Sequence, residues 1–266
     1  MKLGLIGQHI GHSLSQKLHT NALAYCGITG EFNVFDLAAG QVAETLNNCF
    51  QSGYAGLNVT APYKEIVTEY CESLQPPVDI FGSTNTLVRG KNGWIAQSTD
   101  HKGVWFAMDR IGLIETGSAL LLGAGGSARA ACYALLERKW QVSVAARRIE
   151  QALQLAEDAI SIGEVNVVPW EYREQYIDQA HFIVQCTTIG NDGISSPLPL
   201  DRNYPSSLSY LDVLYSPRET PLAALLKRHG IRTMNGLPWL FGQGAAAFQL
   251  WTNRTMPDSL FDELEK

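Results

Sequence analysis

The sequence has no long apolar run and no excess of basic residues. Its apolar runs, such as Ser118-Ala-Leu-Leu-Leu-Gly123, are far shorter than the roughly 20 residues that a membrane-spanning helix needs. Lysine and arginine total 20 against 26 aspartates and glutamates, which gives a net charge of -6. Phosphate backbones and anionic lipid surfaces attract proteins that carry an excess of positive charge. We therefore expect neither a nucleic acid nor a membrane as a partner.

Cysteine is also scarce, and its spacing does not match that of a metal site. The five cysteines lie far apart, and no Cys-x-x-Cys pair occurs among them. This pattern suits neither a disulfide framework nor a zinc site, so we expect no metal. The start of the chain, with a lone Lys2 before a short apolar stretch, lacks the features of a secretory signal peptide. A reducing compartment, the cytoplasm, is the expected location.

Short apolar runs alternate with helix-length amphipathic stretches along the 266 residues, which predicts an α/β fold with parallel strands covered by helices. A chain of this length buries one large core or two smaller ones. The strands are expected near Leu3–Ile6, Glu31–Phe35, Ala55–Val59, Ala119–Leu122, Val142–Ala145, Val165–Val168, Phe182–Gln185 and Tyr210–Leu214.

One hairpin interrupts this alternation and suggests where a first domain ends. Two short apolar runs within Thr86–Gln97 flank a turn, Gly90-Lys91-Asn92-Gly93, whose Asn-Gly pair tolerates positive φ. A helix is expected over 100–112, and a last long helix over 236–251 that returns to the first domain. The predicted domains are residues 1–100 with 237–266, and residues 101–236.

A glycine-rich motif follows the strand expected at Ala119–Leu122 and opens a helix. It reads Gly123-Ala124-Gly125-Gly126-Ser127-Ala128, a Gly-x-Gly-x-x-Ala variant. In dinucleotide-binding units the first glycine allows a tight turn and the second lets the backbone approach a pyrophosphate, while the third small residue permits close helix packing. The helix N-terminus adds unpaired N–H groups. A simple glycine-rich turn is the alternative.

The residues after the next strand bear on the choice of cofactor. Enzymes that prefer NAD place an acidic residue about 20 positions after the glycine motif, against the ribose 2′-hydroxyl. Here that position is Ala146, and Arg147 and Arg148 follow it. Two guanidiniums suit a 2′-phosphate, so NADP(H) is the predicted cofactor. The alternative is a solvated arginine pair at a helix start, and Glu150 keeps NAD open.

Polar motifs in the first domain stand where strands give way to loops or helices. They are Gly11-His12-Ser13-Leu14-Ser15, Asn58-Val59-Thr60-Ala61-Pro62-Tyr63-Lys64, and Asn85-Thr86 with Ser98-Thr99-Asp100. Together with the glycine motif, Asp212-Val-Leu-Tyr-Ser-Pro217 and Gln243-Gly-Ala-Ala-Ala-Phe248, they resemble the shikimate dehydrogenase family over nearly the whole chain.

The resemblance implies NADP-dependent, reversible reduction of 3-dehydroshikimate to shikimate, a step of chorismate and aromatic amino acid biosynthesis. It implies an N-terminal α/β substrate domain and a C-terminal Rossmann-like NADP-binding domain, with the active site in the cleft between them. Family members occur as monomers and as dimers, so a monomer or a homodimer is expected.

Two charged residues are the expected catalytic pair by this resemblance, Lys64 as proton donor and Asp100 as the group that orients or recharges it. Lys64 follows Pro62 at a predicted helix start, where the helix dipole disfavours an ammonium, and Asp100 is a candidate to compensate. An exposed surface lysine is the alternative for Lys64 taken alone.

The remaining site residues are expected to contact the substrate or the cofactor. Ser15 is expected to cap a helix over 16–26, where a carboxylate is welcome, and helix capping alone is the alternative for Ser13 and Ser15. The substrate residues are Ser13, Ser15, Asn58, Thr60, Asn85, Tyr215 and Gln243. The cofactor residues are Gly123, Ala124, Gly125, Gly126, Ser127, Ala128, Arg147, Arg148, Thr187 and Gly236. A strand-end cap for Asn58 and a plain turn for Gly236 stay open. His12, His19 and His101 are interpreted as surface or capping histidines.

Some positions depart from the family pattern, and they leave two further functions open. Ser98 stands where Asn is usual, Ala146 replaces an Asn, and Gln185-Cys186-Thr187 replaces Asn-Ala-Thr. A related enzyme for quinate or another hydroxylated ring acid is one alternative. A nucleotide-binding sensor that has lost turnover is the other, although the presence of Lys64 and Asp100 argues against it.

Overall fold

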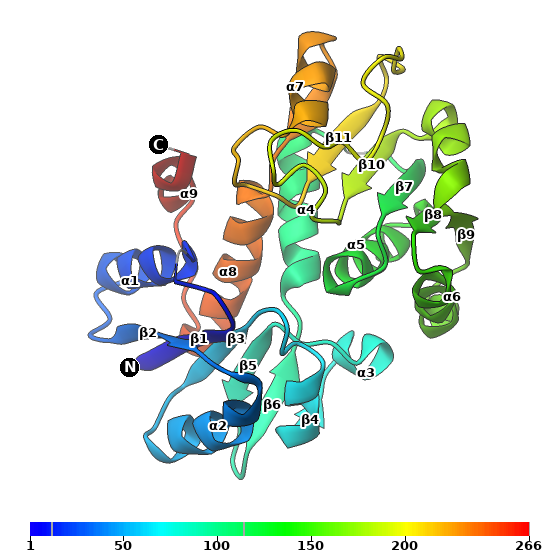
Figure 1. The fold of residues 1–266 in the computed structure, drawn as a ribbon. Coiled ribbons are helices and arrows are strands. Elements are labelled where there is room, and N and C mark those ends of the chain that lie inside the picture. Colours follow the sequence, from blue (N-terminus) through cyan, green and yellow to red (C-terminus); the bar gives the residue numbers. More distant parts are fainter. Residues whose placement is uncertain (12, 114, 266) are drawn as a thin grey trace. The chain divides into compact units, whose positions relative to one another are not determined.

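The structure is a computed structural model that describes residues 1–11, 13–113 and 115–265 (Figure 1). The chain divides into two compact units, one formed by Met1–Thr99 with Gln243–Lys266 and the other by Asp100–Gly242. Asp100 falls in the second unit because it is the first residue of helix α4 (Asp100–Ile111), which packs on α5 (Gly126–Glu137). Leu237–Gly242 falls there too, since a Cβ added to Gly242 would meet Phe106 of α4.

The first unit contains a six-stranded mixed sheet in the order β2-β1-β3-β5-β6-β4. Its strands are β1 (Lys2–Gly7), β2 (Glu31–Asp36), β3 (Gly56–Val59), β4 (Cys71–Leu74), β5 (Thr86–Arg89) and β6 (Trp94–Gln97). Strands β2, β1 and β3 run parallel, whereas β5 pairs antiparallel with both β3 and β6. The carboxyl end of β3, which carries Asn58, therefore lies beside the start of β5, which carries Thr86.

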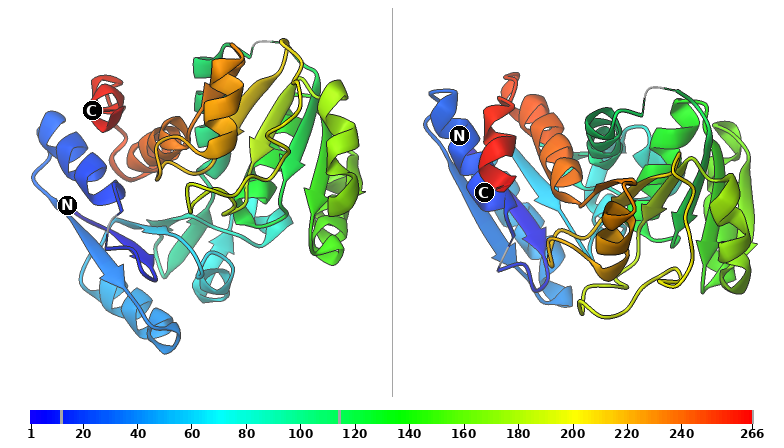
Figure 2. Two further views of the ribbon diagram at one scale, coloured as in Figure 1. Left: turned by 45° about the horizontal axis from the view of Figure 1, so that its top comes forward. Right: turned by 90° about the horizontal axis from the view of Figure 1, so that it is seen from above.

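Helices from both ends of the chain pack on this sheet. Helix α1 (Ser15–Tyr25) lies beside α9 (Ser259–Glu265), the blue and red helices of Figure 2, and Asn21 Nδ2 donates to Glu263 Oε2 at 3.2 Å. Helix α8 (Leu237–Thr252) brings Trp251 onto β3, where it fills the space that a side chain at Gly56 would take. The indole Nε1 of Trp251 donates to the Leu87 carbonyl oxygen at 3.0 Å. Helix α2 (Val42–Gln51) contributes Val42 and Leu46 to a separate apolar cluster with Ile6 and Leu57.

The second unit contains a parallel six-stranded sheet in the order β12-β11-β10-β7-β8-β9. Its strands are β7 (Ser118–Leu122), β8 (Gln141–Ala146), β9 (Val165–Pro169), β10 (Phe182–Gln185), β11 (Ser209–Asp212) and β12 (Arg232–Met234). Numbered from β7, this is the order 3-2-1-4-5-6 of the dinucleotide-binding doubly wound fold. In such sheets ligands bind at the carboxyl ends of the strands where the order reverses, here β7 and β10.

Helices cover both faces of this second sheet. The 3₁₀ helix η4 (Trp170–Gln179) and α7 (Pro221–Arg228) supply Ile177, Leu222 and Leu226 to one apolar cluster with Leu120 and Leu122 of β7. Right-handed crossovers place α5 and α6 (Ile149–Asp158) on the opposite face. The α/β class predicted from the alternation of apolar runs is thereby confirmed.

Every strand that the sequence predicts is present, but several elements were not predicted, among them β4, β12 and η4. Strand β4 lies at the sheet edge with alternating half-buried and exposed residues, β12 has three residues, and η4 is a polar helix with only Ile177 buried. The predicted strand over 210–214 ends at Asp212. The hairpin forms, yet the expectation of positive φ at Asn92-Gly93 is wrong. Gly90 N instead donates to the Gly93 carbonyl oxygen across the turn, at 2.8 Å.

Among the helices of the described residues, none is both long enough and apolar enough to cross a membrane.

Candidate active site

A network of buried amides and hydroxyls lies in the first unit, and it joins three of the predicted substrate residues. We call it the amide network: Asn58, Asn85, Thr86, Thr99 and Gln243, each at most 9% exposed. Asn85 Nδ2 donates to Gln243 Oε1 and to Thr99 Oγ1, both at 3.0 Å, and Asn85 Oδ1 accepts from Thr99 N at 2.7 Å. The network thus ties the strand pair β3 and β5 to helix α8.

Asn58 enters the amide network through its Nδ2 group. This nitrogen donates to the Asn85 backbone carbonyl oxygen at 3.2 Å and lies 3.4 Å from Thr86 Oγ1. A backbone carbonyl only accepts hydrogen bonds, so the orientation of the Asn58 carboxamide is fixed with nitrogen on that side. Its Oδ1 is buried and has no hydrogen-bond partner in the structure.

The two serines of the first motif lie at the start of α1, but their roles differ from the expectation. Ser15 is the first residue of the helix and is buried, and it is not the N-cap, because the N-cap position falls on Leu14. Ser13 Oγ accepts from Ser15 N at 3.3 Å, so the hydroxyl that serves the helix start belongs to Ser13. The prediction that Ser15 caps this helix is therefore wrong. His12, between the strand and Ser13, lies outside the described residues.

Thr60 and Lys64 follow the carboxyl end of β3. Thr60 N donates to the Ile6 carbonyl oxygen at 2.9 Å, which holds this segment against β1. Lys64 is half-buried in a turn over 61–65, and its carbonyl oxygen accepts from Thr84 N at 2.8 Å. The expected helix start at Lys64 is wrong, since only the short 3₁₀ helix η2 (Ile66–Tyr70) follows. A helix dipole therefore does not act on this ammonium.

Asp100 and Tyr215 belong to the second unit, unlike the other predicted substrate and catalytic residues. Asp100 begins α4 and is 8% exposed. Tyr215 is half-buried in the loop after β11, where burial raises the pKa of its phenol. That loop is fixed by Asp212, whose carboxylate accepts from Leu214 N, Tyr210 Oη and Thr220 Oγ1 at 3.0, 2.9 and 2.8 Å. The pairing of Lys64 with Asp100 stays a prediction.

The glycine motif forms the turn between β7 and α5. Gly123 has φ of +109°, and a Cβ there would lie 3.0 Å from Thr187 Cγ2 and 3.3 Å from the Cys186 carbonyl oxygen. Glycine is therefore required at this position by both conformation and space. Gly125 faces open space, because a Cβ added to it would have no atom within 4 Å. It is also the N-cap of α5, and since it has no side chain, no side-chain cap binds the first amides of this helix. This cradle fits the phosphates of a dinucleotide.

The rest of the glycine motif keeps α5 close to the sheet. Ala128 is fully buried and Ala124 nearly so, whereas Gly126 and Ser127 are half-buried in the first turn of the helix. Arg147 and Arg148 follow β8, and both are exposed. Gly236 is buried before α8, and a side chain there would overlap the Val213 carbonyl oxygen.

The loop after β10 is held by Gln185, a residue that the sequence marked only as a departure from the family pattern. Gln185 is fully buried, and its Oε1 accepts from Thr187 N and Thr187 Oγ1, both at 3.1 Å. Its Nε2 donates to the Ile189 carbonyl oxygen at 2.9 Å, and Ile189 N donates to Thr187 Oγ1. Thr187 thus shapes the loop with its hydroxyl and packs its methyl group toward Gly123.

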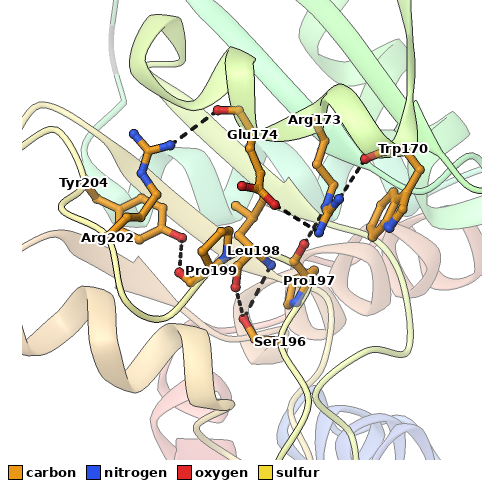
Figure 3. A network of polar contacts seen from close by, with 9 residues as sticks. All are labelled: Trp170, Arg173, Glu174, Ser196, Pro197, Leu198, Pro199, Arg202 and Tyr204. Carbon is orange, nitrogen blue, oxygen red and sulfur yellow. Dashed lines mark hydrogen bonds and ion pairs between the residues drawn. The ribbon is translucent and has the colours of Figure 1, made fainter.

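Further along, the segment over 196–204 is tied to η4 by a network of polar contacts (Figure 3). Arg173 donates from Nε to the Pro197 carbonyl oxygen at 2.7 Å and from a terminal nitrogen to the Trp170 carbonyl oxygen at 2.8 Å. Its guanidinium also stacks over the Trp170 ring, 4.5 Å from the centroid. Tyr204 Oη donates to the Pro199 carbonyl oxygen at 2.7 Å. These contacts hold the long segment between β10 and β11 on the face that η4 covers.

The interpretation of His19 and His101 as surface or capping residues is wrong. His19 is 0% and His101 7% exposed, because both pack among aromatic side chains. Burial lowers the pKa of His19 to about 3 and that of His101 to about 4. Both imidazoles are therefore neutral at pH 7. Their helical spacing among apolar residues was the signal in the sequence that indicated burial.

Each of the two units contains a segment that matches a known protein family. Residues 5–87 match the family model described as shikimate dehydrogenase substrate binding domain, and residues 106–195 match shikimate / quinate 5-dehydrogenase. The shikimate dehydrogenase (NADP(+)) of Anaeromyxobacter dehalogenans is 33% identical over 259 residues, which cover 96% of this chain and 92% of the relative.

Solved structures give the same result. The shikimate 5-dehydrogenase of Thermus thermophilus, in complex with NADP(H) and shikimate, matches with a TM-score of 0.90 and 31% identity over 99% of this chain and 97% of its own. The quinate dehydrogenase of Corynebacterium glutamicum, in complex with NAD, matches with a TM-score of 0.91 and 25% identity over 99% and 97%. The chain belongs to the shikimate dehydrogenase family.

Proposed function

We propose that this protein catalyses the reversible, NADP-dependent reduction of 3-dehydroshikimate to shikimate. The observation that carries the proposal is the amide network, which gathers Asn58, Asn85 and Gln243 in the unit that matches the substrate binding domain of the family. Buried amides that are already oriented by one another recognise ring hydroxyls without reorganising. The similarity to shikimate dehydrogenases over 96% of the chain supports the same substrate.

The substrate is a small ring carboxylate bearing hydroxyls, and the predicted residues divide accordingly. Ser13 and Ser15, at the start of α1, offer hydroxyls and helix amides to the carboxylate. Asn58, Thr60, Asn85 and Gln243 offer amide or hydroxyl groups to the ring hydroxyls. Tyr215 joins the carboxylate end of the site.

The proposed chemistry requires one proton to move as the ketone becomes an alcohol. Lys64 Nζ donates this proton to the carbonyl oxygen as negative charge develops there, and in the reverse direction it accepts the proton of the alcohol. Asp100 orients the ammonium, or it relays a proton from solvent to the lysine after the lysine has given its own to the substrate. A nicotinamide cofactor held at the glycine motif would supply or take the hydride. Because a lysine and a carboxylate carry the proton, this scheme assigns no role to a metal.

The cofactor is proposed to lie across the carboxyl ends of β7 and β10, where the strand order reverses. The turn at Gly123, Ala124 and Gly125 and the first turn of α5, with Gly126, Ser127 and Ala128, would hold the pyrophosphate. Arg147 and Arg148 would hold the 2′-phosphate. Thr187 and Gly236, on the loops after β10 and β12, would border the nicotinamide.

Replacement of both Arg147 and Arg148 by alanine is expected to raise the KM for NADP about tenfold or more, since two charge-assisted contacts to a phosphate are lost in an exposed setting. The KM for NAD should change less than about threefold, because NAD has no 2′-phosphate. The KM values for NADP and for NAD are measured at saturating shikimate, for the double variant and for the unsubstituted protein. Arg254→Ala, which removes an exposed arginine of the first unit, is the control. An equal loss with both cofactors would contradict this role.

The proposed function is tested by mixing purified protein with shikimate or quinate and with NADP or NAD, and by following the absorbance of the reduced nicotinamide, NADPH or NADH, that forms. We expect the highest kcat/KM with shikimate and NADP. Preference for quinate with NAD would instead group the chain with the Corynebacterium glutamicum enzyme. Binding of NADPH without turnover of either acid would overturn the proposal in favour of a nucleotide sensor.

A further inference from the structure

His19 is the most deeply buried titratable side chain of the first unit to which the proposed chemistry gives no role. It projects from α1 into a cage of aromatic rings, stacked on Phe32 of β2 with centroids 4.7 Å apart and planes 5° apart. Phe248 and Trp251 of α8 complete the cage, with ring centroids 6.2 and 5.2 Å away. Neither ring nitrogen has a hydrogen-bond partner in the structure.

The side chain of Asn58 lies on the same face of the sheet. Leu3 of β1 pairs with both Phe32 and Gly56, so these residues share a face, and Asn58, two positions after Gly56, shares it as well. Trp251 covers Gly56, and His19 contacts Trp251. Burial lowers the pKa of the imidazole, and the nearby side chain of Asn58 raises it by a smaller amount. The Asn58 side chain therefore lies close enough to affect the ring.

The hydrogen-bonding chemistry of the two groups is complementary. The nitrogen of the Asn58 amide is committed to the Asn85 carbonyl, so its buried Oδ1 needs a donor. A neutral imidazole carries one N–H donor. Two buried polar groups left unpaired side by side cost stability, whereas one hydrogen bond between them removes both penalties.

We propose that His19 is a positioning residue for the substrate site, whose ring N–H donates to Asn58 Oδ1 and so fixes the carboxamide within the amide network. This inference rests on the proposed function, because it assigns His19 an effect on shikimate binding. His19 touches neither substrate nor cofactor in this scheme. It acts through Asn58, so its removal weakens binding of the hydroxylated ring without altering the proton transfer at Lys64.

His19→Phe keeps an aromatic ring in the cage and removes the donor. We expect the KM for shikimate to rise about fivefold to tenfold, the equivalent of one lost hydrogen bond, with kcat changed less than about twofold. His19→Gln restores a donor and should recover part of the affinity. Phe248→Leu loosens the same cage and leaves the N–H in place, so it should lower the melting temperature with little change in KM.

A double-variant cycle separates positioning from packing. If His19 acts through Asn58, the KM of His19→Phe with Asn58→Ala should match that of Asn58→Ala alone, because the group that His19 holds is already gone. A KM for the double variant equal to the product of the two separate effects would overturn the proposal. So would a KM for His19→Phe within twofold of the unsubstituted protein.

A measurement without turnover keeps this inference distinct from the proposed function. In protein labelled with ¹⁵N-histidine, Asn58→Ala should shift the ring nitrogen resonances of His19 and leave those of His229, an exposed residue at the end of α7, unchanged. Unshifted His19 resonances would refute the contact, whether or not the enzyme turns over shikimate or His19→Phe folds. A shift together with inactive protein would leave the contact standing and refute the shikimate dehydrogenase assignment alone.

Discussion

Lys64→Ala is expected to lower kcat about a thousandfold while the KM for shikimate changes only a few times. The reason is that a positioned general acid typically contributes between about a hundredfold and ten-thousandfold, whereas binding rests mainly on the serines and the amide network. In the variant the alcohol must lose its proton to water. The pH at which shikimate oxidation is fastest should therefore be higher. Initial rates of shikimate oxidation, at saturating NADP and over a range of pH, measure both effects.

Two further variants decide what Lys64 contributes. Lys64→Arg keeps the positive charge but holds its proton at any working pH, so it should be nearly as slow as Lys64→Ala if proton transfer is the role. Activity close to that of the unsubstituted enzyme in Lys64→Arg would reduce the role to electrostatics. Lys91→Ala, on the exposed turn between β5 and β6, is the matched control and should leave kcat unchanged. Retained turnover in Lys64→Ala would remove this residue from the mechanism.

Gly56→Ala should destabilise the first unit by about 3 kcal/mol or more, at the upper end of what overpacking a core costs. The added methyl group would overlap the indole of Trp251, which is 7% exposed and held by its hydrogen bond to the Leu87 carbonyl oxygen. Relief of the overlap requires α8 to move away from β3, which breaks that bond and opens the cage around His19.

Thermal unfolding followed by circular dichroism tests this expectation, and a fall in the melting temperature of roughly 10 °C is predicted for a chain of this size. Gly40→Ala is the matched control, because this exposed glycine has no atom within 4 Å of an added Cβ. A melting temperature for Gly56→Ala equal to that of the control would contradict the expectation, because it would show that Trp251 can move aside without lowering the stability of the fold. Restoration by a second change, Trp251→Phe, would identify the overlap as the cause.

The elements most readily predicted were those set by local patterns. Runs of apolar residues such as Ala119–Leu122 must be buried on both faces, which leaves little alternative to a central parallel strand. The glycine motif was equally informative, since the turn at Gly123 needs positive φ and no side chain. Edge strand β4 and the polar helix η4 lack such patterns, because solvent satisfies much of their surface.

The motifs singled out candidate site residues, but they did not predict the contacts between them. Asn58, Asn85 and Gln243 were singled out by motif, yet the hydrogen bond from Asn85 to Gln243 joins residues 158 positions apart. Capping by Ser13 instead of Ser15 depends on a single backbone turn, which short motifs do not specify. The burial of His19 depends on rings contributed by β2 and α8, so it follows from tertiary packing alone.

The first unit is assembled from segments at opposite ends of the chain, and this has a consequence during translation. Domains generally form as they leave the ribosome. Asp100–Gly242 is synthesised as one uninterrupted stretch, whereas the sheet of the first unit lacks Trp251, and α1 lacks its partner α9, until the segment after Gly242 has been made. The second unit can therefore fold first, while the face of the first sheet that Trp251 covers is still exposed to water in the nascent protein.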